Sequence, residues 1–270
     1  MMVELNGIRY RVEITGNGSP LVLLHGFTGS LDTWTPFIPL FAKEYRVIAL
    51  DLLGHGATEA PNDPKRYEIE KAADDLMALF DQLAIGDAHL LGYSMGGRLA
   101  LLTACREPER IRSLMLESSS PGLRAKREQK ERMAHDEKLA AFIEEKGVEA
   151  FVDVWENIPL FQTQKRLPLD ERKKIRASRL KQRERGLANS LRGMGTGKQP
   201  SLWEHLPNLF IPTLLLAGEE DHKFVRLAEE MDKLLPQSEK KIIPGCGHAI
   251  HIENRRLFAS LVLSFLREQN

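Results

Sequence analysis

The stretch Gly92-Tyr93-Ser94-Met95-Gly96 decides the fold of this chain. It follows the apolar run 88–91 and precedes a helix-like run over residues 97–106. A G-x-S-x-G sequence between a strand and a helix is typical of a nucleophile elbow, in which a sharp turn lifts the serine clear of the sheet. Glycines flank the serine because the crowded turn leaves no room for side chains. The sequence therefore predicts a strand, a tight turn carrying a reactive serine, and a helix.

Strand and helix patterns alternate on both sides of this elbow. Unalternating apolar runs predict strands that are buried on both faces, and the run 69–83 has helical periodicity. A hairpin signal at Asn6-Gly7 divides the strand pattern at the N-terminus. We expect an α/β fold, a mostly parallel central sheet with helices on both faces. The predicted strands are 3–14, 20–25, 45–50, 88–92, 111–117, 211–217 and 240–243, and a final helix covers 254–268.

Residues 123–205 differ from the rest of the chain in composition and periodicity. This segment is rich in Arg, Lys and Glu, is helical in pattern and contains no convincing buried strand. We therefore expect an α/β core over residues 1–122 and 206–270, interrupted by a helical cap insertion over residues 123–205, hereafter the cap. Helices are expected at about 124–146, 147–156, 168–185 and 186–194.

The composition of the chain limits which binding partners and which cellular compartment are expected. The chain has 270 residues, 42% of them hydrophobic and 28% charged, and 38 basic residues balance 38 acidic ones. A net charge of zero gives no electrostatic case for nucleic acid or membrane partners, and no apolar run approaches the roughly 20 residues of a spanning helix. Two cysteines, Cys105 and Cys246, and an N-terminus unlike a signal peptide predict a reduced, cytoplasmic protein. No sequence spacing indicates a metal or a cofactor.

Ser94 needs two partners to become reactive. An imidazole must take the proton of the hydroxyl, and a carboxylate must orient that imidazole. With a nucleophile elbow the chain order is serine, acid, histidine. Asp221 closes an apolar strand that runs into a polar turn, and His248 lies on a Gly-rich loop 27 residues further on. These two residues are the predicted partners, although Asp221 could instead be an N-cap of the helix that follows it.

Other acids and histidines have simpler explanations. Asp51 also follows a strand, but it precedes the serine, so we expect it to hold its own loop. His251 competes with His248, yet packing or capping at a helix start explains it better. His25 and His55 are expected to shape loops, and His89 to pack inside the core.

A third component of such a site is a pair of N–H donors for a developing oxyanion. The turn Leu24-His25-Gly26-Phe27-Thr28-Gly29 follows the first buried strand, so the N–H of Phe27 could point toward the site. The N–H of Met95 would be the second donor. Losing one such donor costs roughly 3 kcal/mol of barrier.

Arg98 lies four residues after Ser94, one helical turn along, so both side chains can face one pocket. A guanidinium beside a nucleophile suits an anionic substrate, because arginine grips carboxylates through two hydrogen bonds. The alternative is an ordinary ion pair on the helix face.

Together these segments resemble the α/β-hydrolase superfamily over nearly the whole chain. Within it, the chain resembles the family of 2-succinyl-6-hydroxy-2,4-cyclohexadiene-1-carboxylate (SHCHC) synthases of menaquinone biosynthesis. The motifs that carry the superfamily resemblance are His25-Gly26, 51–56, 92–96, 218–221 and 245–248, and those that carry the family resemblance are Arg98, 119–124, 151–155 and 186–197.

The resemblance implies a lyase that eliminates pyruvate from 2-succinyl-5-enolpyruvyl-6-hydroxy-3-cyclohexene-1-carboxylate, without cofactor or metal. That substrate is a small-molecule tricarboxylate, which agrees with the inference from Arg98. Ser94 would act as a general base toward the proton α to the succinyl ketone. Expected substrate ligands besides Arg98 are Arg124, Arg179 or Lys181, Tyr93 and Trp155, while the remaining charges of 126–132 read as a solvated helix face. We expect a monomer or weak homo-oligomer.

Two rival functions use the same residues. A serine hydrolase of an ester, or of a C–C bond in an anionic substrate, would need a water path to an acylated Ser94. A non-catalytic receptor on this fold would usually have lost one of the three residues Ser94, Asp221 and His248, which are all present here.

Overall fold

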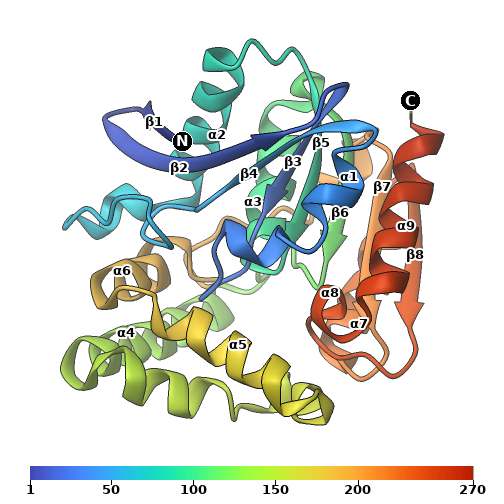
Figure 1. The fold of residues 1–270 in the computed structure, drawn as a ribbon. Coiled ribbons are helices and arrows are strands. Elements are labelled where there is room, and N and C mark those ends of the chain that lie inside the picture. The colour runs from blue at the N-terminus through green and yellow to red at the C-terminus, as the bar shows by residue number, and fades with distance from the viewer. Residues whose placement is uncertain (270) are drawn as a thin grey trace.

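The computed structural model describes residues 1–269 of the chain and is built around one eight-stranded sheet. The strand order is β1-β2-β4-β3-β5-β6-β7-β8. Strand β2 pairs antiparallel with β1 and β4, and all other pairs are parallel (Figure 1). The strands are β1 Met2–Leu5, β2 Ile8–Thr15, β3 Ser19–Leu24, β4 Tyr45–Leu50, β5 Ala88–Tyr93, β6 Ile111–Glu117, β7 Thr213–Gly218 and β8 Ser238–Ile243.

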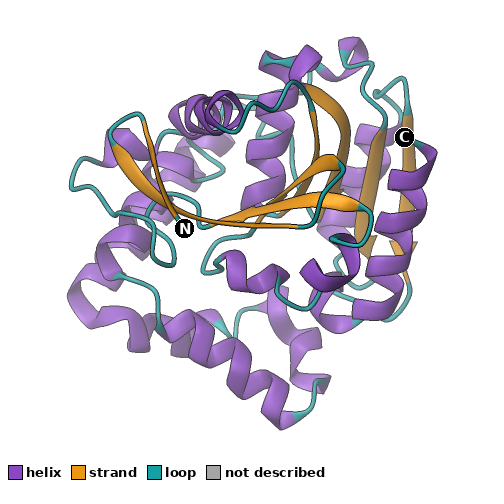
Figure 2. Cartoon of the chain, turned by 45° about the horizontal axis from the view of Figure 1, so that its top comes forward, coloured by secondary structure: helices purple, strands orange, loops and turns teal. Residues whose placement is uncertain are grey.

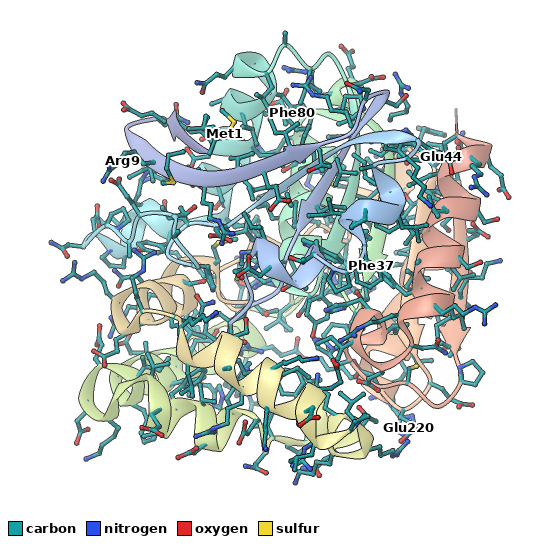
Figure 3. The ribbon with its side chains drawn as sticks, viewed as in Figure 1. Met1, Arg9, Phe37, Glu44, Phe80 and Glu220 are labelled. Carbon is teal, nitrogen blue, oxygen red and sulfur yellow. The ribbon has the colours of Figure 1, made fainter. Side chains whose placement is uncertain are left out.

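Helices cover both faces of this sheet, as predicted (Figure 2). Apolar side chains of α2, α3 and α7 pack on one face, and those of α1 and α9 pack on the other. Phe80 and Phe37, labelled in Figure 3, belong to these two separate clusters. Every residue of β5 and β7 is buried, which explains their unbroken apolar runs. The core helices are α1 Ile38–Phe41, α2 Ile69–Gln82, α3 Met95–Arg106, α7 His222–Asp232, α8 Ile250–Glu253 and α9 Arg255–Glu268.

The cap helices α4 (Lys126–Trp155), α5 (Leu169–Leu180) and α6 (Glu184–Met194) leave the sheet after β6 and return to it at β7. They lie together beyond the lower edge of the sheet in Figure 1. Helices α4 and α6 share their own apolar cluster, which includes Phe151 and Leu187. Helix α4 is interrupted at Gly147, whose φ of 84° is costly for other residues. This break agrees with the predicted boundary between the helices 124–146 and 147–156.

One predicted cap helix is wrong at its C-terminal end. The pattern predicts a helix over 168–185, but α5 ends at Leu180. The side chain of Gln182 accepts a hydrogen bond from the N–H of Gly56 and donates one to the carbonyl of Gly29. Arg183 is then extended, with φ −104° and ψ 135°, before α6 begins. These contacts with core loops are tertiary, so helical periodicity could not reveal them. The domain limits of 123 and 205 stay a prediction.

Candidate active site

Ser94 occupies the sharp turn between β5 and α3. Its φ of 50° and ψ of −105° lie outside the regions that non-glycine residues favour, a strain that costs about 1–3 kcal/mol and is typical of functional sites. The flanking glycines are required by contact. A Cβ on Gly92 would lie 2.5 Å from the carbonyl oxygen of Gly96, and one on Gly96 would lie 2.2 Å from that of Leu24. The predicted elbow is therefore present, and its geometry explains its sequence.

Three loops at the carboxyl ends of parallel strands bring Ser94, His248 and Asp221 together. Nε2 of His248 lies 3.0 Å from Oγ of Ser94, and Nδ1 lies 2.6 Å from Oδ2 of Asp221. His248 and Asp221 are both buried. Because an ionised Asp221 can only accept, Nδ1 carries the proton and Nε2 is left to accept from the serine hydroxyl. Asp221 stands at the N-cap of α7, but its side chain makes no capping hydrogen bond.

The competing acids and histidines make other contacts. Asp51 accepts hydrogen bonds from the N–H groups of Leu31 and Ala57, which fixes its loop as expected. His25 accepts from the N–H of Leu52. Burial lowers the pKa of His25 to about 4, so its ring stays neutral and shapes the turn. His251 bonds to a buried carboxylate of β6 instead of to Ser94.

His55 and His89 are also buried and make contacts that do not involve Ser94. Burial lowers the pKa of His55 to about 3, and its Nδ1 bonds to the carbonyl of Leu53 in the same loop. His89 is buried in β5, with Nδ1 2.7 Å from Oγ of Ser113. Both therefore have the structural roles that the sequence predicts.

Phe27 and Met95 both line a cavity of about 200 Å³ above Ser94, hereafter the Ser94 cavity. Met95 is the first residue of α3, so its N–H has no partner within the helix. Phe27 lies within a turn that is closed by a 3.0 Å hydrogen bond from the N–H of Gly29 to the carbonyl of Gly26. The two proposed oxyanion donors thus belong to residues on either side of one cavity.

Cationic side chains surround the Ser94 cavity. Arg98 is 8% exposed and donates a hydrogen bond to Oε1 of Gln199 at 3.0 Å. No carboxylate of residues 1–269 forms an ion pair with Arg98. Burial lowers the pKa of Arg98 to about 10, which still leaves it charged at neutral pH. The nearest stabilising charge is Asp136, which is already paired directly with Arg132. A buried guanidinium without a direct ion pair is costly, so this arrangement suits an anionic ligand.

Sequence reasoning missed two further cations that line the Ser94 cavity, Arg132 and Lys223. The charge pattern predicts that Arg132 lies on a solvated helix face. In the structure its Nε donates a hydrogen bond to Asp136 at 2.8 Å, and its side chain lines the cavity. The buried Asp136, four residues further along α4, was the one available signal. Lys223 lies two residues after Asp221 and is exposed on one side, while partial desolvation and the nearby Arg132 lower its pKa.

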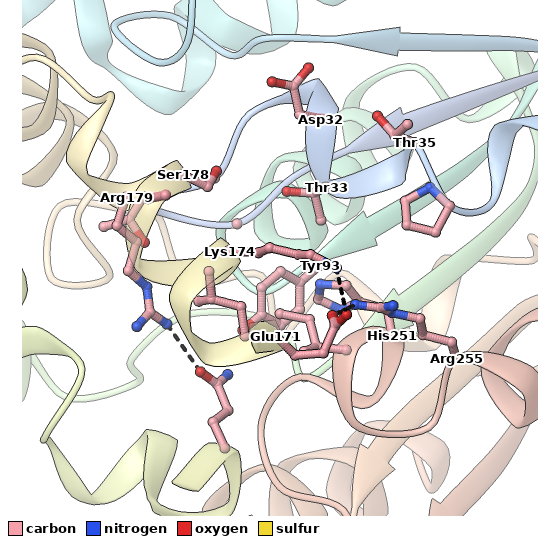
Figure 4. Close-up of a pocket in the computed structure, with 18 of the residues that line it drawn as sticks. Asp32, Thr33, Thr35, Tyr93, Glu171, Lys174, Ser178, Arg179, His251 and Arg255 are labelled. Carbon is pink, nitrogen blue, oxygen red and sulfur yellow. Dashed lines mark hydrogen bonds and ion pairs between the residues drawn. The ribbon is translucent and has the colours of Figure 1, made fainter. Parts of the chain in front are cut away.

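The other predicted substrate ligands in this region line two neighbouring pockets. Tyr93 and Trp155 line the Ser94 cavity, and Nε1 of Trp155 is buried without a hydrogen-bond partner. Arg179 and Lys181 line an adjacent pocket of about 450 Å³, the α5 pocket, which shares Tyr93 with the cavity (Figure 4). Arg179 is buried there, and it contacts Oε1 of Gln164 at 3.2 Å.

The prediction for Arg124 is wrong. Its guanidinium pairs with Glu230 of α7 at 2.7 Å and lies 3.6 Å from the ring centre of Trp203. Arg124 is exposed and lines neither the Ser94 cavity nor the α5 pocket. The residue precedes α4, so its direction depends on how the chain leaves the core, which the sequence does not reveal.

The sheet, the elbow and the cap define a protein of the α/β-hydrolase fold, and the alpha/beta hydrolase fold family matches residues 19–255. A putative SHCHC synthase of Bacillus subtilis is 49% identical over 263 residues, covering 97% of this chain and 96% of that protein. An SHCHC synthase of Photorhabdus laumondii is 32% identical, covering 91% and 84%. The structure of MenH from S. aureus superposes with a TM-score of 0.92 at 38% identity, covering 96% and 98%.

The chain belongs to the SHCHC synthase family of α/β-hydrolase fold proteins. Structural likeness extends further, since a thermophilic esterase from Thermogutta terrifontis has a TM-score of 0.88 at 28% identity over 100% of this chain and 99% of that one. The fold alone therefore does not decide the reaction. Among residues 1–269 there is no helix long and apolar enough to cross a membrane, and no cluster of side chains suited to a metal.

Proposed function

We propose that this protein is an SHCHC synthase, a carbon–oxygen lyase of menaquinone biosynthesis. It would eliminate pyruvate from 2-succinyl-5-enolpyruvyl-6-hydroxy-3-cyclohexene-1-carboxylate. The observation that carries the proposal is the hydrogen-bonded series Ser94–His248–Asp221, which opens on a cavity lined by Arg98, Arg132 and Lys223. The 49% identical relative of that name supports it.

In the proposed mechanism, the residues 94, 248 and 221 form a catalytic triad used for proton abstraction. Oγ of Ser94 removes the proton α to the succinyl ketone, and its own proton passes to Nε2 of His248. Asp221 stabilises the imidazolium that forms. The electron pair moves through the ring and breaks the C–O bond to the enolpyruvyl group, which takes up a proton and leaves as pyruvate. No water is consumed and no acyl-enzyme forms.

The backbone N–H groups of Phe27 and Met95 would donate to the enolate oxygen. Such donors act strongly because the site is fixed before reaction and excludes water. Apolar side chains of Phe161, Leu160 and Leu227 are part of the lining of the Ser94 cavity.

The substrate class follows from the charges. A tricarboxylate needs several cations, and the Ser94 cavity offers Arg98, Arg132 and Lys223, with Arg179 in the adjoining α5 pocket. Arginine and carboxylate pair through parallel hydrogen bonds, each charge-assisted and stronger than a neutral one. The proposal therefore includes Arg98 as the first carboxylate ligand. Cytoplasmic location and a monomeric or weakly oligomeric state stay predictions.

A second candidate is hydrolysis of an ester or C–C bond in an anionic substrate. It is favoured by one observation, the 3.0 Å contact between Ser94 and His248, which serves nucleophilic attack as well as base catalysis.

One experiment separates the two candidates. The purified protein is incubated with the enolpyruvyl substrate and, separately, with p-nitrophenyl acetate. Pyruvate release without ester turnover supports the lyase. Ester turnover with no pyruvate would favour the hydrolase and contradict the proposal. The Ser94→Ala variant is the control for both assays.

A further inference from the structure

We propose that Glu117 is a positioning residue that sets the distance between Ser94 and His248. The inference rests on the proposed function only for its turnover readout. Glu117 is the last residue of β6, beside Tyr93 of β5 in the parallel register. Its backbone carbonyl accepts a 2.8 Å hydrogen bond from the N–H of Ser94. One end of this residue is thus tied directly to the elbow.

The side chain of the same residue is tied to the loop that carries His248. Oε1 of Glu117 accepts from the backbone N–H of His251 at 3.0 Å, and Oε2 lies 2.8 Å from Nδ1 of the His251 ring. His251 follows His248 by three residues, at the start of α8. Glu117 therefore joins the two loops whose side chains must meet, through its carbonyl on one side and its carboxylate on the other.

The backbone N–H of His251 can only donate, so Oε1 of Glu117 is an acceptor. In the tautomer that carries its proton on Nδ1, the ring of His251 donates a second hydrogen bond to the same carboxylate. Glu117 is 0% exposed. The other end of the ring, Nε2 of His251, is buried without a hydrogen-bond partner.

Stability alone does not account for this arrangement. Burying a carboxylate is costly, and apolar residues of similar volume often stabilise a core as well or better. The inward residues of β6 before Glu117, such as Met115 and Leu116, are apolar. The His251 ring packs beside Tyr93, with ring centres 4.5 Å apart (Figure 4), and beside Trp34 at 5.4 Å. A buried carboxylate and imidazole in this aromatic setting are explained by the two loops that their hydrogen bonds hold together.

The test uses Glu117→Gln, which keeps the shape and removes the charge. Its amide has one acceptor oxygen for the backbone N–H and places an NH2 group near Nδ1, so the His251 ring must change tautomer or turn, and we expect the His248 loop to shift relative to Ser94. We expect kcat for pyruvate release to fall about 10- to 100-fold, because displacements near 1 Å have that effect. KM should stay within about twofold of the wild-type value, since Glu117 is not among the residues that line the Ser94 cavity.

A second readout does not depend on the natural substrate. A fluorophosphonate reacts when Oγ of Ser94 attacks phosphorus, fluoride leaves and His248 takes the proton. Its second-order rate constant should fall in parallel with kcat. If the wild type reacts with this probe but releases no pyruvate, the proposed function fails while the positioning inference is still tested.

Asp75→Asn is the matched control. Asp75 is also a buried carboxylate, bonded to Tyr10, Asn6 and Arg66, but it lies on α2 and lines neither pocket. It should lose stability while its phosphonylation rate stays at the wild-type value. A folded Glu117→Gln protein with unchanged kcat and phosphonylation rate would overturn the inference.

If Glu117→Gln does not fold, two substitutions at His251 replace it. Asn at this position can donate from nearly the place of Nδ1, whereas Ala cannot. We expect His251→Asn to retain most of the phosphonylation rate and His251→Ala to lose about 10-fold or more. Equal rates in the two variants would contradict the positioning role.

Discussion

Replacing Arg98 by alanine should weaken substrate binding far more than it slows chemistry. The side chain is buried and lines the same cavity as Ser94, and its one hydrogen bond to residues 1–269 goes to the neutral Gln199. Hydrogen bonds to charged groups contribute about 1.5–3 kcal/mol. Since each 1.4 kcal/mol corresponds to a factor of ten, the expected rise in KM is about 10- to 150-fold. The direction follows from the proposed role, in which Arg98 would bind a carboxylate equally in the ground state and the transition state.

The assay is the initial rate of pyruvate release against substrate concentration. Arg106→Ala is the control, because Arg106 lies on the same helix but is exposed and paired with Asp74. It should leave KM and kcat unchanged. Arg98→Lys keeps the charge and loses the paired hydrogen bonds of the guanidinium, so its KM should lie between those of the wild type and Arg98→Ala. An unchanged KM in Arg98→Ala would refute the carboxylate-binding role of this residue.

Three further predictions concern the elbow, the triad and acid stability. Ser94→Ala and His248→Ala should each lower kcat by orders of magnitude while the protein stays folded, and a variant with near-wild-type turnover would contradict the triad. Gly96→Ala should destabilise the fold by about 1–3 kcal/mol or more in denaturant unfolding, whereas Gly86→Ala, where a Cβ meets nothing within 4 Å, should not. The buried ring of His55 has its pKa lowered to about 3, while the unfolded chain binds its proton below pH 6.5. In unfolding titrations His55 should therefore contribute up to about 1.4 kcal/mol per pH unit to the loss of stability as pH falls from 6.5 to 3, in addition to the contribution of His25, and the slope should be smaller in His55→Gln; equal slopes would refute this.

The elbow and the positions of the buried strands were predictable because local sequence and local geometry agree there. The glycines at 92 and 96 are required by backbone contacts close to the turn itself. Strands such as β7 are buried on both faces, so their apolar runs stand out. The chain order Ser94, Asp221, His248 then limits the partners to loops that follow strands. The structure brings these three residues together.

The cation set was less predictable because it depends on how the cap packs on the core. Arg124 and Arg132 lie eight residues apart in similarly charged sequence, yet only Arg132 reaches the Ser94 cavity. Their directions depend on the contact of α4 with α6, which is tertiary. The contact between Glu117 and His251 was not predictable either, because it is a tertiary contact between residues 134 positions apart in the sequence.

The central claim is that Ser94 removes a proton to start an elimination. The most direct measurement is the single-turnover rate of pyruvate release from substrate deuterated at the ring carbon α to the succinyl ketone. The account predicts slower release than from the undeuterated substrate, because breaking that bond to hydrogen precedes loss of the C–O bond. Equal single-turnover rates for the two substrates would contradict it.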